Sequence, residues 1–172
     1  STRSGVTVSG STAIFNMYGG KITGNSHKGT NADSNAYGGG VRVRREGTFN
    51  MYGGEISGNT CAGRYYSYGG GVCVEDKGSI FNMYGGTIAN NETGVSVVST
   101  SKLTVGDSAN IANNKKNVFL YDKAMITIDS SLTPAALIGV TTETDPTDEK
   151  RIQIATGATG WVTYTDIFKP DG

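Results

Sequence analysis

The sequence predicts an all-β fold, a solenoid in which short parallel strands stack coil upon coil, and two repeated phrases predict it. The first phrase begins Phe-Asn-Met-Tyr-Gly-Gly and ends five residues later on an asparagine; it occupies residues 15–25, 49–59 and 81–91. The second reads Gly-Gly-Gly-Val-x-Val and occupies residues 38–43 and 69–74, with a degraded copy at 93–97. Self-similarity at a fixed period is typical of stacked repeats, so these phrases decide the architecture.

The repeat unit is 22 to 23 residues long. Between the asparagine of the first phrase and the first valine of the second, two copies carry insertions of 12 and 9 residues, at 26–37 and 60–68. Without these insertions, the spacings from Phe15 to Phe49 and from Phe49 to Phe81 shrink from 34 and 32 residues to 22 and 23. The next repeat, which has no insertion, is 22 residues long.

Each unit is expected to contribute three short strands. Apolar residues alternate with polar ones at Phe15 and Met17, and again at Val41 and Val43, with glycine-rich corners between them. Alternation of this kind indicates strands, and short strands separated by tight bends pair with the equivalent strands of the next unit. The fold expected is therefore a right-handed parallel β-helix, with coils stacked about 4.8 Å apart.

Stacked coils place like residues above one another, in ladders that run along the solenoid. The inward ladders expected to form the core are Phe15, Phe49, Phe81, Leu103 and Ile126; Met17, Met51, Met83, Val105 and Ile128; Ile22, Ile56, Ile88 and Ile111; and Val6, Val41, Val72, Val95 and Val118. At one corner, an asparagine of each coil is expected to adopt left-handed backbone angles and to hydrogen-bond its stacked copies, at Asn25, Asn59, Asn91 and Asn114.

The chain is expected to divide into coils at residues 1–128, which carry the insertions, and a final coil with a C-terminal cap at residues 129–172. The alternation persists in the second region without the repeat, and a solenoid needs an atypical terminal unit that covers its last open edge. Trp161 and Phe168 are expected to pack over the final coil. Because the sequence starts inside the repeat pattern, we expect it to be a piece of a longer protein.

Composition argues against two classes of partner. Among 172 residues, 15 basic residues balance 15 acidic ones, whereas a nucleic-acid partner would require a basic surface. No segment approaches the ~18 consecutive apolar residues of a transmembrane helix, so insertion into a membrane is not expected. The 26 glycines agree with a single elongated domain rich in bends, which as a module is expected to be monomeric.

The two phrases carry a resemblance to a known class of protein. In the form F-x-M-x-G-G-x-I-x-x-N alternating with G-G-G-V-x-V, the chain resembles the right-handed β-helix repeat regions of large cell-surface proteins of Gram-positive gut bacteria. It is more distantly similar to the GGA(I/V) and FxxN repeats of chlamydial polymorphic outer-membrane proteins. The resemblance covers about Val6 to Val140 and implies extracellular display on the bacterial surface, with a role in adhesion or spacing. It names no ligand.

Many parallel β-helices are polysaccharide lyases or glycosidases, and such sites need two or more carboxylates that face one groove. The outward columns expected here contain no acid; they hold Asn16, Asn50, Asn82 and Thr104, and Tyr18, Tyr52 and Tyr84. Glu75 is adjacent to Asp76, but an ion pair with Arg44 of the neighbouring coil explains Glu75 more simply. The single histidine, His27, is expected to be a solvated loop residue, so neither a catalytic triad nor a multi-histidine metal site is expected.

The two insertions are the expected binding site, since loops on a rigid scaffold carry function disproportionately. They leave the same corner of adjacent coils and are expected to bring together Tyr37, Arg64, Tyr65, Tyr66, Tyr68, Asn31, Asp33 and Asn35. These residue types are common in adaptable recognition surfaces. In one alternative, Tyr37 and Tyr68 simply pack against the solenoid wall. In another, the outward column of tyrosines binds sugar rings instead of stacking on itself.

The two cysteines lie near the same corner, Cys61 in the second insertion and Cys73 at an outward strand position. A disulfide that pins the loop and a pair of reduced, exposed thiols are both compatible with the sequence. Two cysteines without a nearby histidine do not predict a metal site, and no cofactor is expected.

The function expected is that of a non-enzymatic adhesin or stalk module, which binds a glycan or a host surface protein through its corner loops. The alternative is a fragment of a polysaccharide lyase or glycoside hydrolase whose catalytic coils lie outside this chain. The expected parent is a larger secreted or wall-anchored protein.

Overall fold

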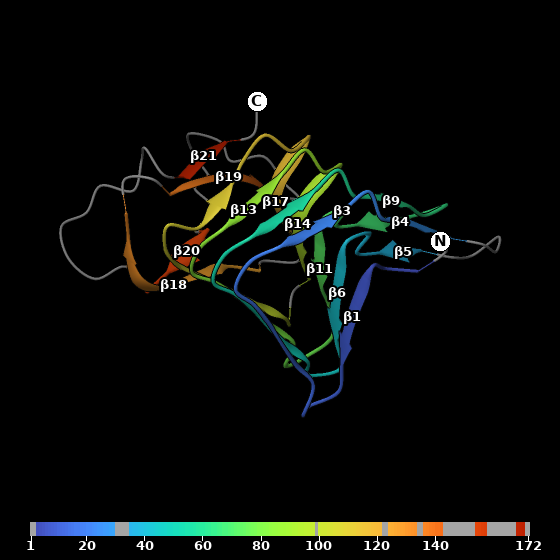
Figure 1. Cartoon of the computed structure of the whole chain (residues 1–172), viewed down its shortest axis with the longest axis horizontal. Helices are drawn as coiled ribbons and strands as arrows, with labels where there is room; N and C mark the ends of the chain where they lie inside the picture. Colours follow the sequence, from blue (N-terminus) through green and yellow to red (C-terminus); the bar gives the residue numbers. More distant parts are fainter. Residues whose placement is uncertain are drawn as a thin grey trace, which may run out of the picture.

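The computed structural model describes residues 3–29, 35–98, 100–121, 124–133, 136–142, 154–157 and 168–170. In these ranges the regular secondary structure is entirely β, and every strand pair is parallel. Figure 1 shows the strands as a curled arrangement that fits a parallel β-solenoid. None of the described ranges forms a helix that is long and apolar enough to cross a membrane.

Three walls of stacked strands surround the core (Figure 1). The first wall contains β1 (Val6–Ser9), β6 (Val41–Arg44), β11 (Val72–Val74), β14 (Thr93–Val97), β17 (Lys116–Leu120) and β19 (Leu137–Thr142). The second contains β2 (Ile14–Met17), β7 (Thr48–Met51), β12 (Ile80–Met83), β15 (Lys102–Asp107), β18 (Ile126–Leu132) and β20 (Ala155–Thr156). The third contains β3 (Lys21–Thr23), β8 (Glu55–Ser57), β13 (Thr87–Ala89) and β16 (Asn110–Ile111), and it also ends on β19.

The register of the strand pairs confirms every inward ladder expected from the repeat. The rings of Phe49 and Phe81 are fully buried and stack with their centroids 4.7 Å apart. Two ladders continue one coil further than the repeat indicates, to Ile138 and Val140. The core is therefore a set of parallel columns of like side chains, in which each coil packs on the next.

The last described coil has a tighter corner than the earlier ones. In the preceding coil six residues separate the third-wall isoleucine, Ile111, from the first-wall valine, Val118. Only Gly139 separates Ile138 from Val140. As a result β19 pairs with β16 at one end and with β17 at the other, and it joins the third and first walls into one sheet.

A ladder of asparagines forms the corner between the third and first walls, as expected. The side chain of Asn59 donates to the carbonyl oxygen of Ile22 in the coil before it (2.9 Å) and to Oδ1 of Asn91 in the coil after it (3.1 Å). Its own Oδ1 accepts from the backbone N–H and the side-chain amide of Asn25, both at 3.0 Å. The same pattern continues to Asn114. Because Asn59 and Asn91 are almost fully buried, the ladder satisfies corner groups that water does not reach.

The left-handed backbone angles expected at the ladder asparagines belong to a different residue, so that expectation is wrong. Positive φ occurs one position earlier, at Gly24 (68°), Gly58 (63°), Asn90 (57°) and Asn113 (59°). That position makes the turn, and it is filled by glycine, which has no Cβ, or by asparagine, which tolerates the conformation. The ladder asparagine is thereby free to point its side chain along the stack.

The asparagine ladder also explains the glycine before the first valine of the second phrase. A Cβ atom at Gly40 would lie 3.0 Å from Nδ2 of Asn59, and one at Gly94 would lie 2.7 Å from Nδ2 of Asn114. The same Cβ atoms would lie 2.7 Å from the carbonyl oxygen of Gly71 and 2.6 Å from that of Asn117, so the glycine leaves room for both the ladder side chain and the backbone of the next coil. At the end of the ladder Asn117 occupies the position that the glycine has in the earlier coils. Asn117 Oδ1 accepts from the backbone N–H (2.9 Å) and the side-chain amide (3.0 Å) of Asn114. Asn117 thus terminates the ladder.

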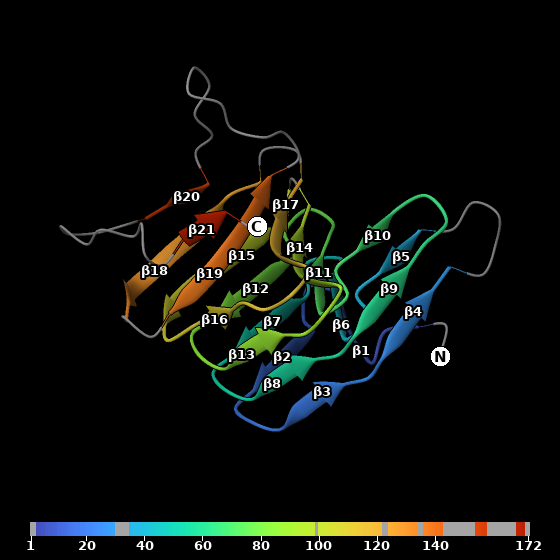
Figure 2. The ribbon, with the colours of Figure 1, turned by 90° about the horizontal axis from the view of Figure 1, so that it is seen from above.

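The solenoid continues past residue 128, into the region expected to hold the final coil and the cap. β18 pairs with β15 on one side and β20 on the other, and β19 pairs with β21 (Phe168–Pro170), which lies beside it in Figure 2. These pairs extend the existing walls. The expected packing of Trp161 and of the Phe168 side chain over the final coil falls outside what the structure describes.

Replacing Phe49 with alanine should destabilise the fold by about 3–5 kcal/mol, because its buried ring stacks between Phe15 and Phe81 and rigid coils cannot close the cavity. Denaturant titration followed by circular dichroism measures the loss. The matched control is Asn50→Ala, which removes half-exposed hydrogen bonds to the asparagines above and below and should cost about 1 kcal/mol. Equal losses would contradict the inward and outward assignments.

Replacing Asn59 with alanine should cost about 2–3 kcal/mol, because it leaves the Asn25 N–H and the Ile22 carbonyl without their partners at a buried corner. The control is Asn25→Ala at the partly exposed end of the ladder, which should cost about 1 kcal/mol. The same titration compares the two variants. If Asn25→Ala is as damaging as Asn59→Ala, burial of the ladder does not set its contribution.

Candidate functional site

In their described residues, 26–29, 35–37 and 60–68, the two insertions (26–37 and 60–68) fold into one extension of the asparagine corner, the inserted arm. The outgoing strands β4 (Ser26–Lys28) and β9 (Thr60–Ala62) pair with each other, and so do the returning strands β5 (Ala36–Tyr37) and β10 (Ser67–Tyr68). Both pairs are parallel, so the arm repeats the coil-on-coil stacking outside the three walls. Figure 2 shows it projecting from the side of the solenoid.

The arm brings together several residues expected to bind a ligand. The rings of Tyr37 and Tyr68 stack with their centroids 5.1 Å apart, and the ring of Tyr66 lies 5.8 Å from that of Tyr68. The side-chain amide of Asn35 donates to the hydroxyl of Tyr37 at 3.2 Å. The aromatic stack therefore links the first insertion to the second.

The tip of the second insertion, residues 64–66, is exposed. Tyr65 and Tyr66 are 60% and 58% exposed, and the guanidinium of Arg64 lies 6.0 Å from the centre of the Tyr65 ring. Exposed tyrosines beside an arginine are typical of recognition surfaces. Asn31 and Asp33, which were also expected here, lie outside the described residues.

The base of the arm packs against the outer face of the first wall, which is one of the alternatives left open by the sequence. Arg42 extends from β6 so that its guanidinium lies 4.4 Å from the centre of the Tyr37 ring. The ring of Tyr68 lies 5.0 Å from that of Tyr121, which follows β17. This cover explains why Cys73 is fully buried although it occupies an outward strand position.

A buried ion pair lies on this covered face. Nε of Arg42 donates to a carboxylate oxygen of Glu75 at 2.6 Å, and Glu75 is only 8% exposed. The pair expected from the sequence, Arg44 with Glu75, is present but longer, at 3.9 Å. Strand register places Arg42 beside Cys73, whose short side chain leaves the long arginine free to reach the carboxylate beyond it. Loss of Arg42 would leave the buried Glu75 carboxylate with only the longer Arg44 contact, so the pair holds this face in place.

Cys61 and Cys73 are free thiols and both are buried, so the expectation of exposed thiols is wrong and the structure forms no disulfide between them. Burial raises the pKa of Cys61 to about 12, and it raises the pKa of Cys73 well above its usual value. A thiol held in its neutral form is a poor nucleophile and a poor metal ligand. In the part of the chain that the structure describes, no three His, Cys, Asp or Glu side chains are grouped to hold a metal ion.

His27 is a half-buried residue of strand β4, which corrects the expectation of a solvated loop residue. Its Nδ1 lies 2.6 Å from the carbonyl oxygen of Tyr37, so the imidazole ties the outgoing strand β4 to the returning strand β5. In the strand register its partner is Cys61 of β9. The histidine is therefore a structural link between the outgoing and returning strands of the first insertion.

The second candidate surface, the outward column of Tyr18, Tyr52 and Tyr84, stacks on itself. Successive ring centroids are 5.0 and 5.6 Å apart, with interplanar angles of 9° and 16°. Neighbouring rings therefore cover each other's faces, which a sugar ring would otherwise use. The hydroxyl of Tyr84 donates to Asp129 at 3.1 Å, and burial together with this carboxylate raises the pKa of Tyr84. Beside the tyrosines runs a ladder of amide hydrogen bonds through Asn16, Asn50 and Asn82.

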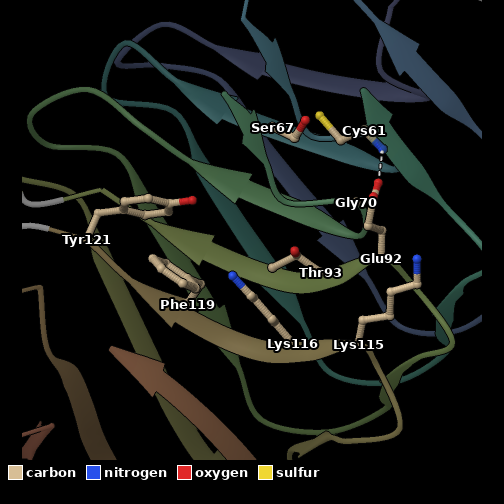
Figure 3. Close-up of a pocket in the computed structure, with 9 residues that line it drawn as sticks. All are labelled: Cys61, Ser67, Gly70, Glu92, Thr93, Lys115, Lys116, Phe119 and Tyr121. Atoms are coloured by element: carbon tan, nitrogen blue, oxygen red, sulfur yellow. Dashed lines mark hydrogen bonds between the residues drawn. The ribbon is translucent and has the colours of Figure 1, made fainter. Parts of the chain in front are cut away.

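A cleft opens where the inserted arm stops. The next two corners contain three residues each, 92–94 and 115–117, so the arm ends after two coils and overhangs them. The cleft has a volume of about 300 Å³ and is lined by Cys61, Ser67, Gly70, Glu92, Thr93, Lys115, Lys116, Phe119 and Tyr121 (Figure 3). A second hollow of about 400 Å³ shares Glu92 and Lys115 with it and is otherwise lined by Thr60, Asn90, Asn91 and Asn113.

The cleft combines aromatic rings with charged groups. Phe119 and Tyr121 lie side by side with their ring centroids 4.3 Å apart, and Nζ of Lys116 is 4.5 Å from the centre of the Phe119 ring (Figure 3). One carboxylate oxygen of Glu92 accepts the backbone N–H of Cys61 at 3.4 Å, which anchors this acid to the edge of β9. Lys115 is exposed and forms no ion pair within the described ranges.

The sequence did not predict this cleft, although it contains one signal for it. Phe119 occupies the outward column that also holds Arg42, Cys73 and Ser96. A large aromatic ring at an outward position of a solenoid indicates that another segment covers it. The segment that covers Phe119 cannot be deduced from the spacing of the repeats. The insertions are not part of the repeat, and the direction in which they leave the corner depends on their own packing.

The thiols of the folded protein should react with iodoacetamide at pH 8 far more slowly than an exposed thiol, because burial suppresses both access and thiolate formation. Mass spectrometry over time measures the rate, and unfolding in urea should release both cysteines. The control places one thiol at an exposed position, with Ser11→Cys in a protein that also carries Cys61→Ser and Cys73→Ser. Reaction of the native cysteines as fast as this control would contradict their burial.

Comparison with known proteins identifies no relative of this chain. No family model matches it, and no curated protein or solved structure is significantly similar to it.

Proposed function

We propose that this chain is a non-enzymatic module of a large bacterial cell-surface protein, in which it acts as an adhesin or a stalk and binds its ligand through the inserted arm. The ligand would be a glycan or a host surface protein. The scaffold would be a right-handed parallel β-helix closed by a C-terminal cap, like the surface-protein repeat regions that the sequence resembles.

The observation that carries this proposal is the order of the inserted arm. The insertions differ in length, 12 against 9 residues, yet their strands align in register and their tyrosines form one stack. The in-line corners let the two insertions start side by side, and the stacked tyrosines then join them into one surface. The arm also places Arg64, Tyr65 and Tyr66 at an exposed tip, on a base held by the Arg42 and Glu75 ion pair. A rigid base with an exposed aromatic tip is suited to recognition.

The environment of three described carboxylates supports a role without glycoside hydrolysis. The general acid of a glycosidase is a carboxyl group whose pKa is raised toward neutrality. Glu55 instead pairs with Lys21 at 2.6 Å, and this partner lowers the pKa of Glu55. Glu75 forms an ion pair with Arg42, and Glu92 accepts a hydrogen bond from the backbone N–H of Cys61.

The triple substitution Arg64→Ala, Tyr65→Ala and Tyr66→Ala should weaken binding at least about tenfold, because it removes the exposed side chains of the tip and leaves the base intact. The ligand is first found by screening the intact module on a glycan array and a panel of host surface proteins. The control is Tyr18→Ala, which removes a more exposed tyrosine (73%) at another corner. Equal weakening by the control would contradict a binding role for the tip.

Deletion of the whole arm provides the second variant of this test. Removing residues 26–37 and 60–68 leaves three glycines at each corner, as many residues as at 92–94, so the coils should still close and fold. Binding should be lost. A deleted protein that keeps full affinity would show that the arm is inert, and an intact module that binds nothing in either screen would favour the stalk over the adhesin.

A further inference from the structure

The cleft at the end of the inserted arm has a composition that identifies a ligand class. We propose that it binds a carboxylated sugar, a uronate unit within an anionic glycan. This inference rests on the proposed binding function of the arm and places the specificity of that function in residues outside both insertions.

The charge of the cleft favours an anion. Lys115 and Lys116 stand at consecutive positions on its floor, and the nearby acid, Glu92, has one oxygen engaged by the Cys61 N–H. The chain as a whole has no net charge, so this pair of lysines is a local feature and not part of a generally basic surface. A lysine ammonium forms a charge-assisted hydrogen bond with a carboxylate.

The aromatic side chains favour an anionic group that belongs to a sugar ring. Phe119 is half-buried beside Tyr121, and Nζ of Lys116 lies 4.5 Å from the centre of the Phe119 ring. In a uronate the carboxylate is bonded directly to the sugar ring. A carboxylate paired with Lys116 would therefore bring that sugar ring to the edge of the Phe119 ring, since Nζ of Lys116 lies over its face. Inorganic anions have no such sugar ring and would use only the lysines.

The second hollow favours a chain of sugars over a single one. It shares Glu92 and Lys115 with the first hollow and adds Thr60, Asn90 and Asn113, whose amide and hydroxyl groups suit sugar hydroxyls. Each hollow lies at the small end of the volumes found for ligand sites, about 300–1,000 Å³. Two adjoining small subsites with polar linings match consecutive units of a glycan.

An acidic peptide would share the carboxylate chemistry, but the edge of the arm is unsuited to it. A peptide that adds a strand to β9 needs the free backbone groups of that strand. The N–H of Cys61 is already occupied by the Glu92 carboxylate, at 3.4 Å. Glu92 would therefore obstruct strand addition at the middle residue of β9.

The test uses the methyl glycosides of glucuronate, galacturonate and mannuronate, each compared with its neutral parent sugar. Amide chemical shifts of the isotope-labelled module are recorded during titration. At least one uronate should shift the amides of Thr93, Lys116 and Phe119, and its neutral parent should not. Added salt should weaken this binding, since exposed charges are screened. If no uronate shifts these amides, or if the neutral sugars shift them equally, the inference is wrong.

Three variants test the named residues. Lys115→Gln with Lys116→Gln should weaken uronate binding about tenfold, and Phe119→Leu should weaken it by removing the flat ring while keeping an apolar side chain. The control is Lys102→Gln, an exposed lysine on the second wall, which should leave it unchanged. Uronate affinity that survives the lysine double variant overturns the inference. So does tighter binding of a polyglutamate peptide than of every uronate.

The outcomes separate this inference from the proposed function. A ligand whose binding is lost with the Arg64, Tyr65 and Tyr66 substitutions but kept in the lysine double variant would preserve the function of the arm and overturn the uronate site. Uronate binding that depends on Lys116 and Phe119 but not on the arm tip would preserve the site and overturn recognition by the tip.

Discussion

The solenoid depends on one register being kept from coil to coil, and the buried asparagine ladder adds directional side-chain hydrogen bonds that hold it at one corner. Apolar ladders alone tolerate small shifts along the strand direction, because dispersion contacts are not directional. The hydrogen bonds of Asn59 to Ile22, Asn25 and Asn91 do not tolerate them. Close coil stacking and the same ladder together leave no room for a Cβ at Gly40, which lies near both the Gly71 carbonyl oxygen and the Asn59 side chain, so they account for repeated features of both phrases.

The inserted arm follows from this register. Because the corners of successive coils are held in line, two insertions that leave neighbouring corners start in line, and their backbones can pair as β4 with β9 and β5 with β10. The arm then covers part of the outer face of the first wall, where Arg42 forms an ion pair with the buried Glu75. Where the insertions stop, the overhang leaves the cleft lined by Lys116 and Phe119. The candidate site thus arises because the coils are alike in their walls but differ in the number of residues inserted at this corner.

The repeat allowed the fold to be predicted in detail. A fixed period combined with alternation determines which residues share a ladder, and the register from Val6 to Val118 agrees. Contacts that leave the repeat were not predictable. The partner of Glu75 depends on the reach of a long Arg42 side chain past Cys73, and the burial of Cys73 depends on where an unrepeated segment folds. The cleft depends on both, so its residues had to come from the structure.

The central claim is that the insertions are a folded continuation of the solenoid, and amide hydrogen exchange of the arm tests it most directly. The N–H groups of Gly29, Ala36, Gly38 and Thr60 donate to carbonyl oxygens of the neighbouring coil at 2.9, 3.1, 2.7 and 2.9 Å. These amides should exchange much more slowly than in an unstructured chain, as amides in paired strands do. Exchange at the rate of an unstructured peptide would show that the insertions are loose loops and would remove the basis for both the arm and the cleft.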